Sequence, residues 1–177
     1  MIKTILVAAD GSDHANKAVA LAAEIGAKFG ARVVVLHALL RDASSDTLRG
    51  LARRRELTKE QRDLLDNYEI DVQSAMASAG LGGTYGPVPA PRELLEPIGR
   101  QVLDRAEEAV KKAGVKKVAT VLAGGDPGDS ILDAAKREKA DLIVLGTRGF
   151  GEIRGLLLGS VSHKVAARAE CPCLTVK

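Results

Sequence analysis

The sequence predicts an α/β protein with a doubly wound, five-stranded parallel sheet in the order 3-2-1-4-5 and helices on both faces. Two observations carry this prediction. Apolar runs alternate along the chain with segments of helical periodicity. The runs are apolar at nearly every position rather than at every second one, which is typical of parallel strands that helices cover on both sides. The 177 residues fit a single domain over 1–177.

The strands are expected at 2–9, 31–39, 115–124, 141–146 and 171–177. Ser12 stands where a helix N-cap belongs, Gly30 suits a helix C-terminus, and Pro127 suits a first helical turn. A further helix is expected from 92, with Gly114 at its end. Its predicted apolar face consists of Val102, Leu103, Ala106, Ala109 and Val110.

Composition narrows the class of protein. Hydrophobic residues make up 46% of the chain, aromatic residues only 2%, so the core must consist of aliphatic side chains. The net charge of +3 would help to attract phosphate but is too small to indicate nucleic acid. The start of the chain has no secretory signal pattern and no run is long enough to cross a bilayer, so we expect a cytoplasmic protein with no membrane partner.

Two cysteines, Cys171 and Cys173, flank Pro172. A C-x-C pair on an extended segment points both side chains to one face, and zinc is one reading of such a pair. A zinc site usually needs further ligands of this kind, and only three histidines are available in the chain to supply them. Small buried hydrophobes are therefore the favoured interpretation.

The segment at about 41–99 is predicted to be a helical and loop insertion after the second strand. Seven basic and seven acidic residues lie between 41 and 69, and a loop rich in Gly and Pro follows at 80–91. The basic run at 48–55 has acidic neighbours and no interleaved aromatics, so we interpret it as a solvated helix face and expect no nucleic-acid partner. The insertion would cover the site, bind a partner or extend the surface.

The segment at 146–162 contains five glycines in seventeen residues. In the predicted order the first and fourth strands are neighbours, so their carboxyl ends, at Asp10 and Gly146, line one crevice. Glycine-rich backbone that leads into a helix N-terminus binds phosphate, because N–H groups and the helix dipole face the anion. The segment Gly159-Ser160-Val161-Ser162 would form that helix start. Neither a G-x-G-x-x-G motif nor a P-loop is present.

The glycines fit the pattern G-x2-G-x9-G-[ST] at Gly146, Gly149, Gly159 and Ser160. This pattern resembles the ATP-binding branch of the universal stress protein family. The stretches "ILVAADGS", "VVVLHAL" and "CPCLTVK" are similar to the first, second and last strands of that family. The resemblance covers about 1–40 and 100–177 and implies a Rossmann-like fold.

The resemblance implies a bound ATP, which Mg²⁺ or Mn²⁺ would accompany. Asp10 would bond the ribose hydroxyls, and the backbone at Ala8 and Ala38 would face the base. The phosphates and sugar would be held by Gly146, Gly149, Gly159, Ser160, Val161 and Ser162. A carboxylate suits a vicinal diol and repels phosphate, which places Asp10 at the sugar. Asp10 as a helix cap alone is the structural alternative.

Several other residues have alternative interpretations of their role. Arg148 and Arg154 would contact phosphate or remain solvated, Gly151 and Gly155 would make the loop flexible, and residues 125–127 would cap a helix. His37 is expected to be packed and hydrogen-bonded, with a pH switch as the alternative. His163 is expected on the surface.

The leading functional hypothesis is an ATP-binding, nucleotide-dependent regulator in the stress response, with slow hydrolysis at most. The alternatives are an ATPase or nucleotidyl-transfer enzyme, with catalytic groups from the insertion, and a nucleotide-independent interaction module. The last strand should form a sheet edge. The resemblance implies that residues 172–177 pair across a homodimer.

Overall fold

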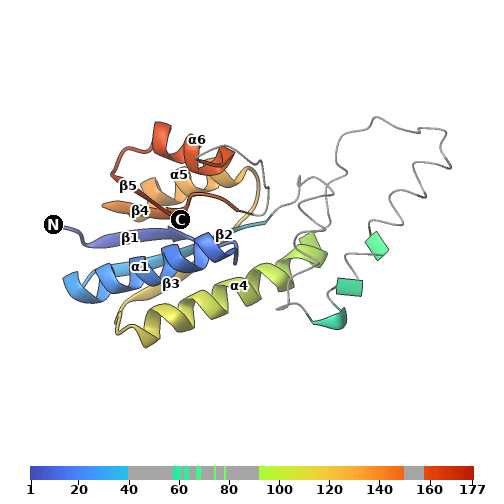
Figure 1. Ribbon diagram of the computed structural model, residues 1–177, viewed down its shortest axis with the longest axis horizontal. Helices are drawn as coiled ribbons and strands as arrows, with labels where there is room; N and C mark the ends of the chain where they lie inside the picture. Colours follow the sequence, from blue (N-terminus) through green and yellow to red (C-terminus); the bar gives the residue numbers. More distant parts are fainter. Residues whose placement is uncertain are drawn as a thin grey trace.

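The computed structural model describes residues 1–39, 58–60, 62–63, 67–68, 74, 78, 92–149 and 158–177. Strands and helices alternate along these residues (Figure 1). The elements are, in chain order, β1 (Thr4–Ala8), α1 (Asp13–Phe29), β2 (Arg32–Ala38), α4 (Arg92–Lys112), β3 (Val118–Ala123), α5 (Pro127–Glu138), β4 (Leu142–Gly146), α6 (Ser160–Arg168) and β5 (Cys173–Val176).

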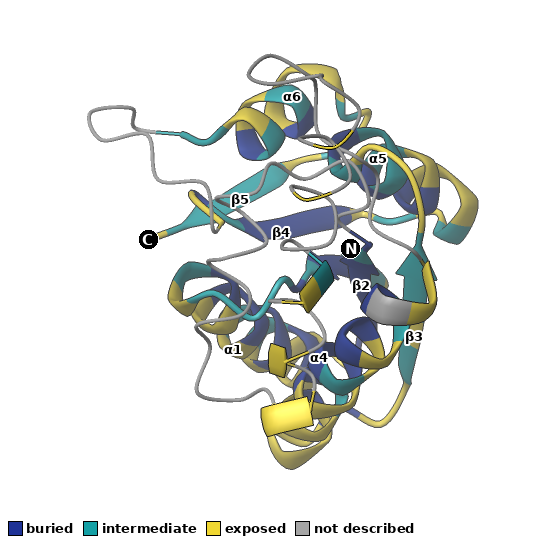
Figure 2. Cartoon of the chain, turned by 90° about the vertical axis from the view of Figure 1, so that its right-hand side faces the viewer, coloured by how far each residue is buried: buried dark blue, intermediate teal, exposed yellow. Residues whose placement is uncertain are grey.

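The five strands form one parallel sheet in the order β3-β2-β1-β4-β5, which confirms the predicted fold class. β1 lies between β2 and β4, with Leu6 paired to Val34 on one side and to Ile143 on the other. The carboxyl ends of all strands therefore meet at one edge of the sheet, which faces the viewer in Figure 2.

Helices cover both faces of the sheet: α1 and α4 lie below it and α5 and α6 above it in Figure 1. Each face has its own cluster of buried aliphatic side chains, with Val33, Val35 and Val110 on the α1/α4 side and Leu36, Ile143 and Val165 on the α5/α6 side. The central strands β1, β2 and β4 are largely buried. The edge strands β3 and β5 are mostly half-buried, as Figure 2 shows. The expected aliphatic core is thus confirmed.

The helix boundaries follow local sequence signals. The Ser12 hydroxyl accepts a hydrogen bond from the N–H of Ala15 at 3.3 Å and caps α1. Gly30 ends the same helix in the left-handed conformation, at φ 65°. Pro127 opens α5, as expected. In α4 the predicted apolar face is buried except at Ala109, which is exposed because it lies at the rim of that stripe.

The predicted insertion at 41–99 lies largely outside the described residues. α4 begins at Arg92, so the last residues of that range belong to a helix that packs against β2 and β3. None of the described helices has the length and apolarity that crossing a bilayer requires.

Candidate functional site

The turn after β1 fixes the carboxylate of Asp10. Its Oδ1 atom accepts a hydrogen bond from the N–H of Ser12 at 2.8 Å. Gly11 between them has φ 80°, a conformation that glycine adopts without steric cost. Because Ser12 and not Asp10 is the N-cap of α1, capping does not account for Asp10. Its carboxylate is held at the carboxyl end of the sheet, beside β4.

The backbone after β4 packs directly on this turn. A Cβ atom added at Gly149 would lie 2.5 Å from Oδ2 of Asp10, so no side chain fits there without displacing the carboxylate. A Cβ at Gly146 would lie 2.9 Å from the backbone N of Ala15, in the first turn of α1. The Ser12 hydroxyl also lies 3.5 Å from the carbonyl oxygen of Arg148. The first and fourth strand ends therefore form one continuous surface.

The start of α6 closes onto the same backbone. The N–H of Gly159 donates to the carbonyl oxygen of Thr147 at 2.7 Å. The Ser162 hydroxyl lies 3.0 Å from that oxygen and 2.9 Å from the carbonyl oxygen of Gly159. The N–H of His163 donates to Gly159, so the N–H groups of residues 160–162 are the ones that a helix start leaves without an intrahelical acceptor.

The three residues at the start of α6 offer different groups. Ser160 is exposed, with its hydroxyl at the first helical position. Ser162 is only 2% exposed and its hydroxyl bonds to backbone carbonyls, so it can offer a ligand its backbone N–H rather than its side chain. Val161 is half-buried and packs against the α5/α6 side of the core.

The ends of β1 and β2 lie side by side on that same face. Ala8 and Ala38 are both half-buried and, like Val161, pack against the α5/α6 cluster. Ala8 is paired with Leu36 in the sheet, so the two alanines lie near the same edge. Their small side chains leave the backbone of both strand ends close to the surface.

His37 is a packed, hydrogen-bonded residue, as expected. It is 5% exposed, and its Nδ1 lies 2.7 Å from the carbonyl oxygen of Ala9. A Cβ at Gly99 of α4 would lie 2.8 Å from its Cδ2 atom, so the helix packs closely on the ring. His37 therefore fixes the backbone that leads into Asp10.

Thr147 makes a polar contact at this junction that the sequence does not predict. Thr147, which is 4% exposed, has its Oγ1 atom 3.1 Å from Nδ1 of His14 in α1. Its N–H donates to the carbonyl oxygen of Val176 at 2.7 Å. Thr147 thus connects β5, α1 and α6. Its signal in the sequence was the position directly after Gly146, where a small polar residue follows a buried strand.

The structure describes some of the remaining candidate residues and leaves others outside the described part of the chain. His163 is exposed and Asp126 caps α5, both as expected, and Arg148 is exposed. Gly151, Arg154 and Gly155 lie outside the described residues. No group of three or more His, Cys, Asp or Glu side chains that could hold a metal ion occurs in the described part of the chain.

The cysteines are free thiols that pack against the α5/α6 side of the core. Partial burial raises the pKa of both the Cys171 and the Cys173 thiol above the usual range. Both side chains are half-buried, so they are somewhat more accessible than the small buried hydrophobes that the sequence predicts.

Comparison with known proteins identifies the family. The family model described as "Universal stress protein family" matches residues 1–177. A universal stress protein of Thermus aquaticus is 37% identical over 185 residues, which cover 100% of both chains.

Solved structures share the fold. A universal stress protein in complex with cAMP matches at a TM-score of 0.60 and 26% identity, over 99% of this chain and 97% of that one. The universal stress protein UspA of Lactobacillus plantarum matches at a TM-score of 0.62 and 21% identity, over 99% and 98% of the two chains. On the full-length family match, the chain belongs to the universal stress protein family.

Proposed function

We propose that this chain binds an adenine nucleotide, ATP foremost, at the carboxyl ends of β1 and β4 and the start of α6. The observation that carries the proposal is that a Cβ at Gly149 would lie 2.5 Å from the Asp10 carboxylate, so the two lie next to each other. It puts a group suited to ribose next to a glycine-rich segment that ends in a helix N-terminus. A related structure, solved in complex with cAMP, supports an adenine nucleotide as the ligand.

Each part of the site suits one part of ATP. The Asp10 carboxylate would accept hydrogen bonds from the ribose hydroxyls. The backbone N–H groups at residues 160–162 and the hydroxyl of Ser160 would donate to phosphate oxygens, and the helix dipole favours negative charge there. The backbone at Ala8 and Ala38 would face the base. Mg²⁺ or Mn²⁺ would bind mainly through the phosphates.

The nucleotide is proposed to regulate rather than to be consumed. The sequence has no P-loop lysine to stabilise the phosphates during transfer, so we expect slow hydrolysis at most. Occupancy would change a partner surface during the stress response, in the cytoplasm where ATP is abundant. An ATPase with catalytic groups from 41–99 is the second candidate. Fast turnover that deletion of this segment abolishes would favour it.

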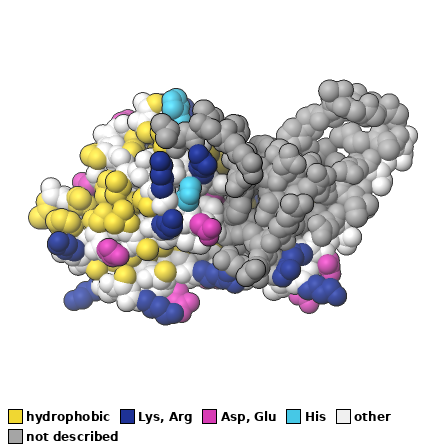
Figure 3. Space-filling model, in the orientation of Figure 1, with side chains coloured by type: hydrophobic (Ala, Val, Ile, Leu, Met, Phe, Trp, Pro, Cys, Tyr) yellow, Lys and Arg dark blue, Asp and Glu magenta, His cyan; other side chains and the backbone are white. Residues whose placement is uncertain are grey.

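We further propose a homodimer that pairs through residues 172–177. β5 is an edge strand with half-buried side chains, and unpaired strand edges favour pairing with a second chain. Figure 3 views this edge and shows hydrophobic side chains gathered beside it. The measurement is molar mass by light scattering. A Leu174→Asp variant should shift a dimer to monomer, whereas a monomeric wild-type protein would contradict the proposal.

The first experiment identifies the ligand directly. The protein is purified without added nucleotide and denatured, and any small molecule released is identified by mass spectrometry. The stripped protein is then titrated with ATP, ADP, AMP and adenosine, with and without Mg²⁺, by calorimetry. Absence of any nucleotide, with no shift of Tm at millimolar ATP, would contradict the proposal and leave a nucleotide-independent interaction module.

A matched pair of variants tests the site itself. Asp10→Asn retains an oxygen that can accept from the N–H of Ser12 but loses the charge, and we expect about a tenfold loss of affinity for ATP, since hydrogen bonds to charged groups contribute about 1.5–3 kcal/mol. Asp13→Asn removes an exposed carboxylate from the first turn of α1 and serves as the control. Equal affinities for the two variants would exclude Asp10 from the site.

A further inference from the structure

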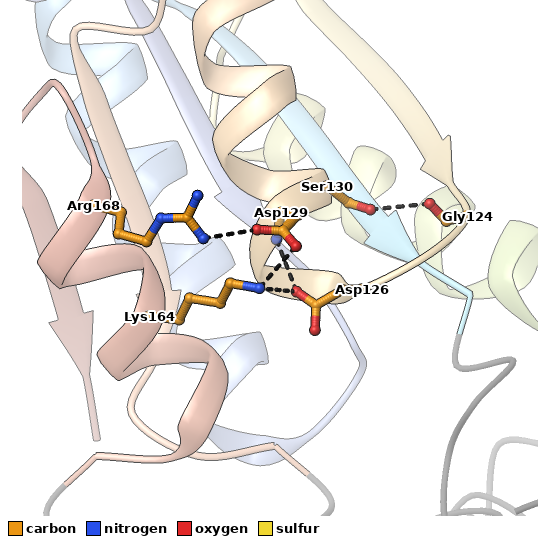
Figure 4. Close-up of polar contacts among 6 residues, drawn as sticks. All are labelled: Gly124, Asp126, Asp129, Ser130, Lys164 and Arg168. Carbon is orange, nitrogen blue, oxygen red and sulfur yellow. Dashed lines mark hydrogen bonds and ion pairs between the residues drawn. The ribbon is translucent and has the colours of Figure 1, made fainter.

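Four charged side chains join the N-cap and first turn of α5 to α6 (Figure 4). Nζ of Lys164 lies 2.8 Å from Oδ1 of Asp126 and 2.8 Å from Oδ2 of Asp129. One turn further along α6, the guanidinium of Arg168 lies 3.0 Å from Oδ1 of Asp129. Lys164 thus bridges two carboxylates on the neighbouring helix.

The backbone of α5 is shaped to admit the Lys164 side chain. A Cβ added at Gly128 would lie 2.6 Å from Cδ of Lys164. Gly128 is buried in the first turn of α5, where glycine costs about 1 kcal/mol of helix propensity relative to alanine. The absence of a side chain at this position lets the aliphatic part of Lys164 lie against the helix. The contact is therefore a packed one as well as an ionic one.

The charges of this cluster balance. Two carboxylates face two cations, and the hydrogen bond from Lys164 lowers the pKa of Asp126 below its usual range. The same contact, with Asp129 next, raises the pKa of Lys164. Both shifts favour the charged forms of Asp126 and Lys164. Without Lys164, the cluster would carry uncompensated negative charge.

We propose that Lys164 is a positioning residue for nucleotide phosphate: it docks α6 on α5 and neutralises Asp126 and Asp129 beside the phosphate-binding helix start. This rests on the proposed function. Lys164 follows Ser160 by four residues, which is about 6 Å along a helix axis. This backbone separation is of the order of the screening length, about 8 Å at physiological ionic strength, so a charge at the cluster acts on the start of α6 with a strength that depends on salt. Negative charge at the cluster would therefore repel phosphate bound at the start of α6.

The test compares ligands of different charge. For Lys164→Met we expect the Kd of ATP to rise about three- to tenfold, the Kd of AMP to rise less, and that of adenosine to change less than about twofold. Raising the salt concentration should reduce the difference. Lys164→Arg should retain ATP affinity within about twofold, because it keeps the charge. Lys111→Met, which removes a lysine paired with Glu107 on α4, is the control.

A second substitution distinguishes an effect of the charge of the cluster on ATP affinity from an effect on folding. Asp126→Asn keeps an oxygen that can accept from the N–H of Asp129, so the cap of α5 remains while one negative charge is lost. Added to Lys164→Met, it should recover at least twofold in ATP affinity. Circular dichroism and Tm establish that each variant is folded.

The outcomes are distinguishable. If the wild-type protein binds no nucleotide, the proposed function fails. If it binds ATP but Lys164→Met weakens ATP and adenosine equally, Lys164 has only a structural role and the inference is wrong. The same conclusion follows if ATP affinity is unchanged, or if Asp126→Asn recovers nothing.

Discussion

The substitution Gly146→Ala should destabilise the fold, whether or not the site is filled. An added Cβ would lie 2.9 Å from the backbone N of Ala15, 2.9 Å from the backbone carbonyl carbon of His14 and 3.0 Å from its Cβ. Ordinary contacts of this kind are several tenths of an ångström longer. The atoms belong to β4 and to the first turn of α1, and neither can move without disturbing the core. Overpacking of this kind costs about 1–3 kcal/mol.

The assay is unfolding by urea and by heat in the absence of nucleotide. For a domain of this size each kcal/mol lowers Tm by about 2–4 °C, so we expect a fall of about 2–12 °C. Gly124→Ala is the control, because a Cβ at Gly124 meets no atom within 4 Å. Its free energy of unfolding should stay within about 0.5 kcal/mol of wild type.

A Gly146→Ala protein as stable as the Gly124→Ala protein would refute the steric argument. It would mean that β4 and α1 separate at little cost. Gly146 would then tolerate a side chain as Gly159 does. In the structure these two glycines differ: the atom nearest to a Cβ at Gly159 lies 3.4 Å away, an ordinary contact, whereas the atom nearest to a Cβ at Gly146 lies 2.9 Å away.

Three further outcomes are expected. Ser12→Ala removes the cap of α1 and should lower the free energy of unfolding by about 1 kcal/mol, measured in urea. Cys171 and Cys173 should react with iodoacetamide at pH 8 more slowly than free cysteine, because burial raises their pKa and leaves less thiolate; equal rates would contradict this. Backbone N–H groups at the start of β1 bond to Asp141 and lower its pKa, so its carboxylate stabilises the fold above about pH 4 and this contribution is lost as the pH falls further. Asp141→Asn should therefore show a smaller loss of stability between pH 6 and 3 than wild type.

The fold was predictable because its signals are local and repeated. Apolar runs, caps and turn residues indicated each strand and helix of the sheet, and the parallel order followed from the alternation of the two. The ends were less accurate. The sequence predicts that the third strand begins at 115, but Val115 is 5% exposed in the turn before β3, which begins at Val118. An apolar residue in a buried turn has the same pattern as one in a strand.

The candidate site was predictable at its backbone and less so at its side chains. The positions of Asp10 and Gly149 follow from the strand order, and the structure places them so close that a Cβ at Gly149 would meet the Asp10 carboxylate. The bond between His14 and Thr147 joins residues that are far apart in sequence, and so does the bridge from Lys164 to Asp126. Neither pair has a spacing that periodicity could reveal. Such contacts depend on how α1 and α6 pack, which local patterns do not encode.

The hydrogen bonds of Thr147 have a consequence for how the protein is handled. Its N–H is bonded to Val176, the last residue of β5, and its carbonyl oxygen accepts the N–H of Gly159 and the hydroxyl of Ser162. An affinity tag or fluorescent fusion at Lys177 would therefore begin one residue from these hydrogen bonds and would disturb the start of α6 through them. A tag at the opposite end of the sheet would leave these hydrogen bonds undisturbed, because Met1 is 97% exposed there. Labels for binding measurements belong at that terminus, and the amide exchange rates of Thr147 and Gly159 would report any disturbance from the other.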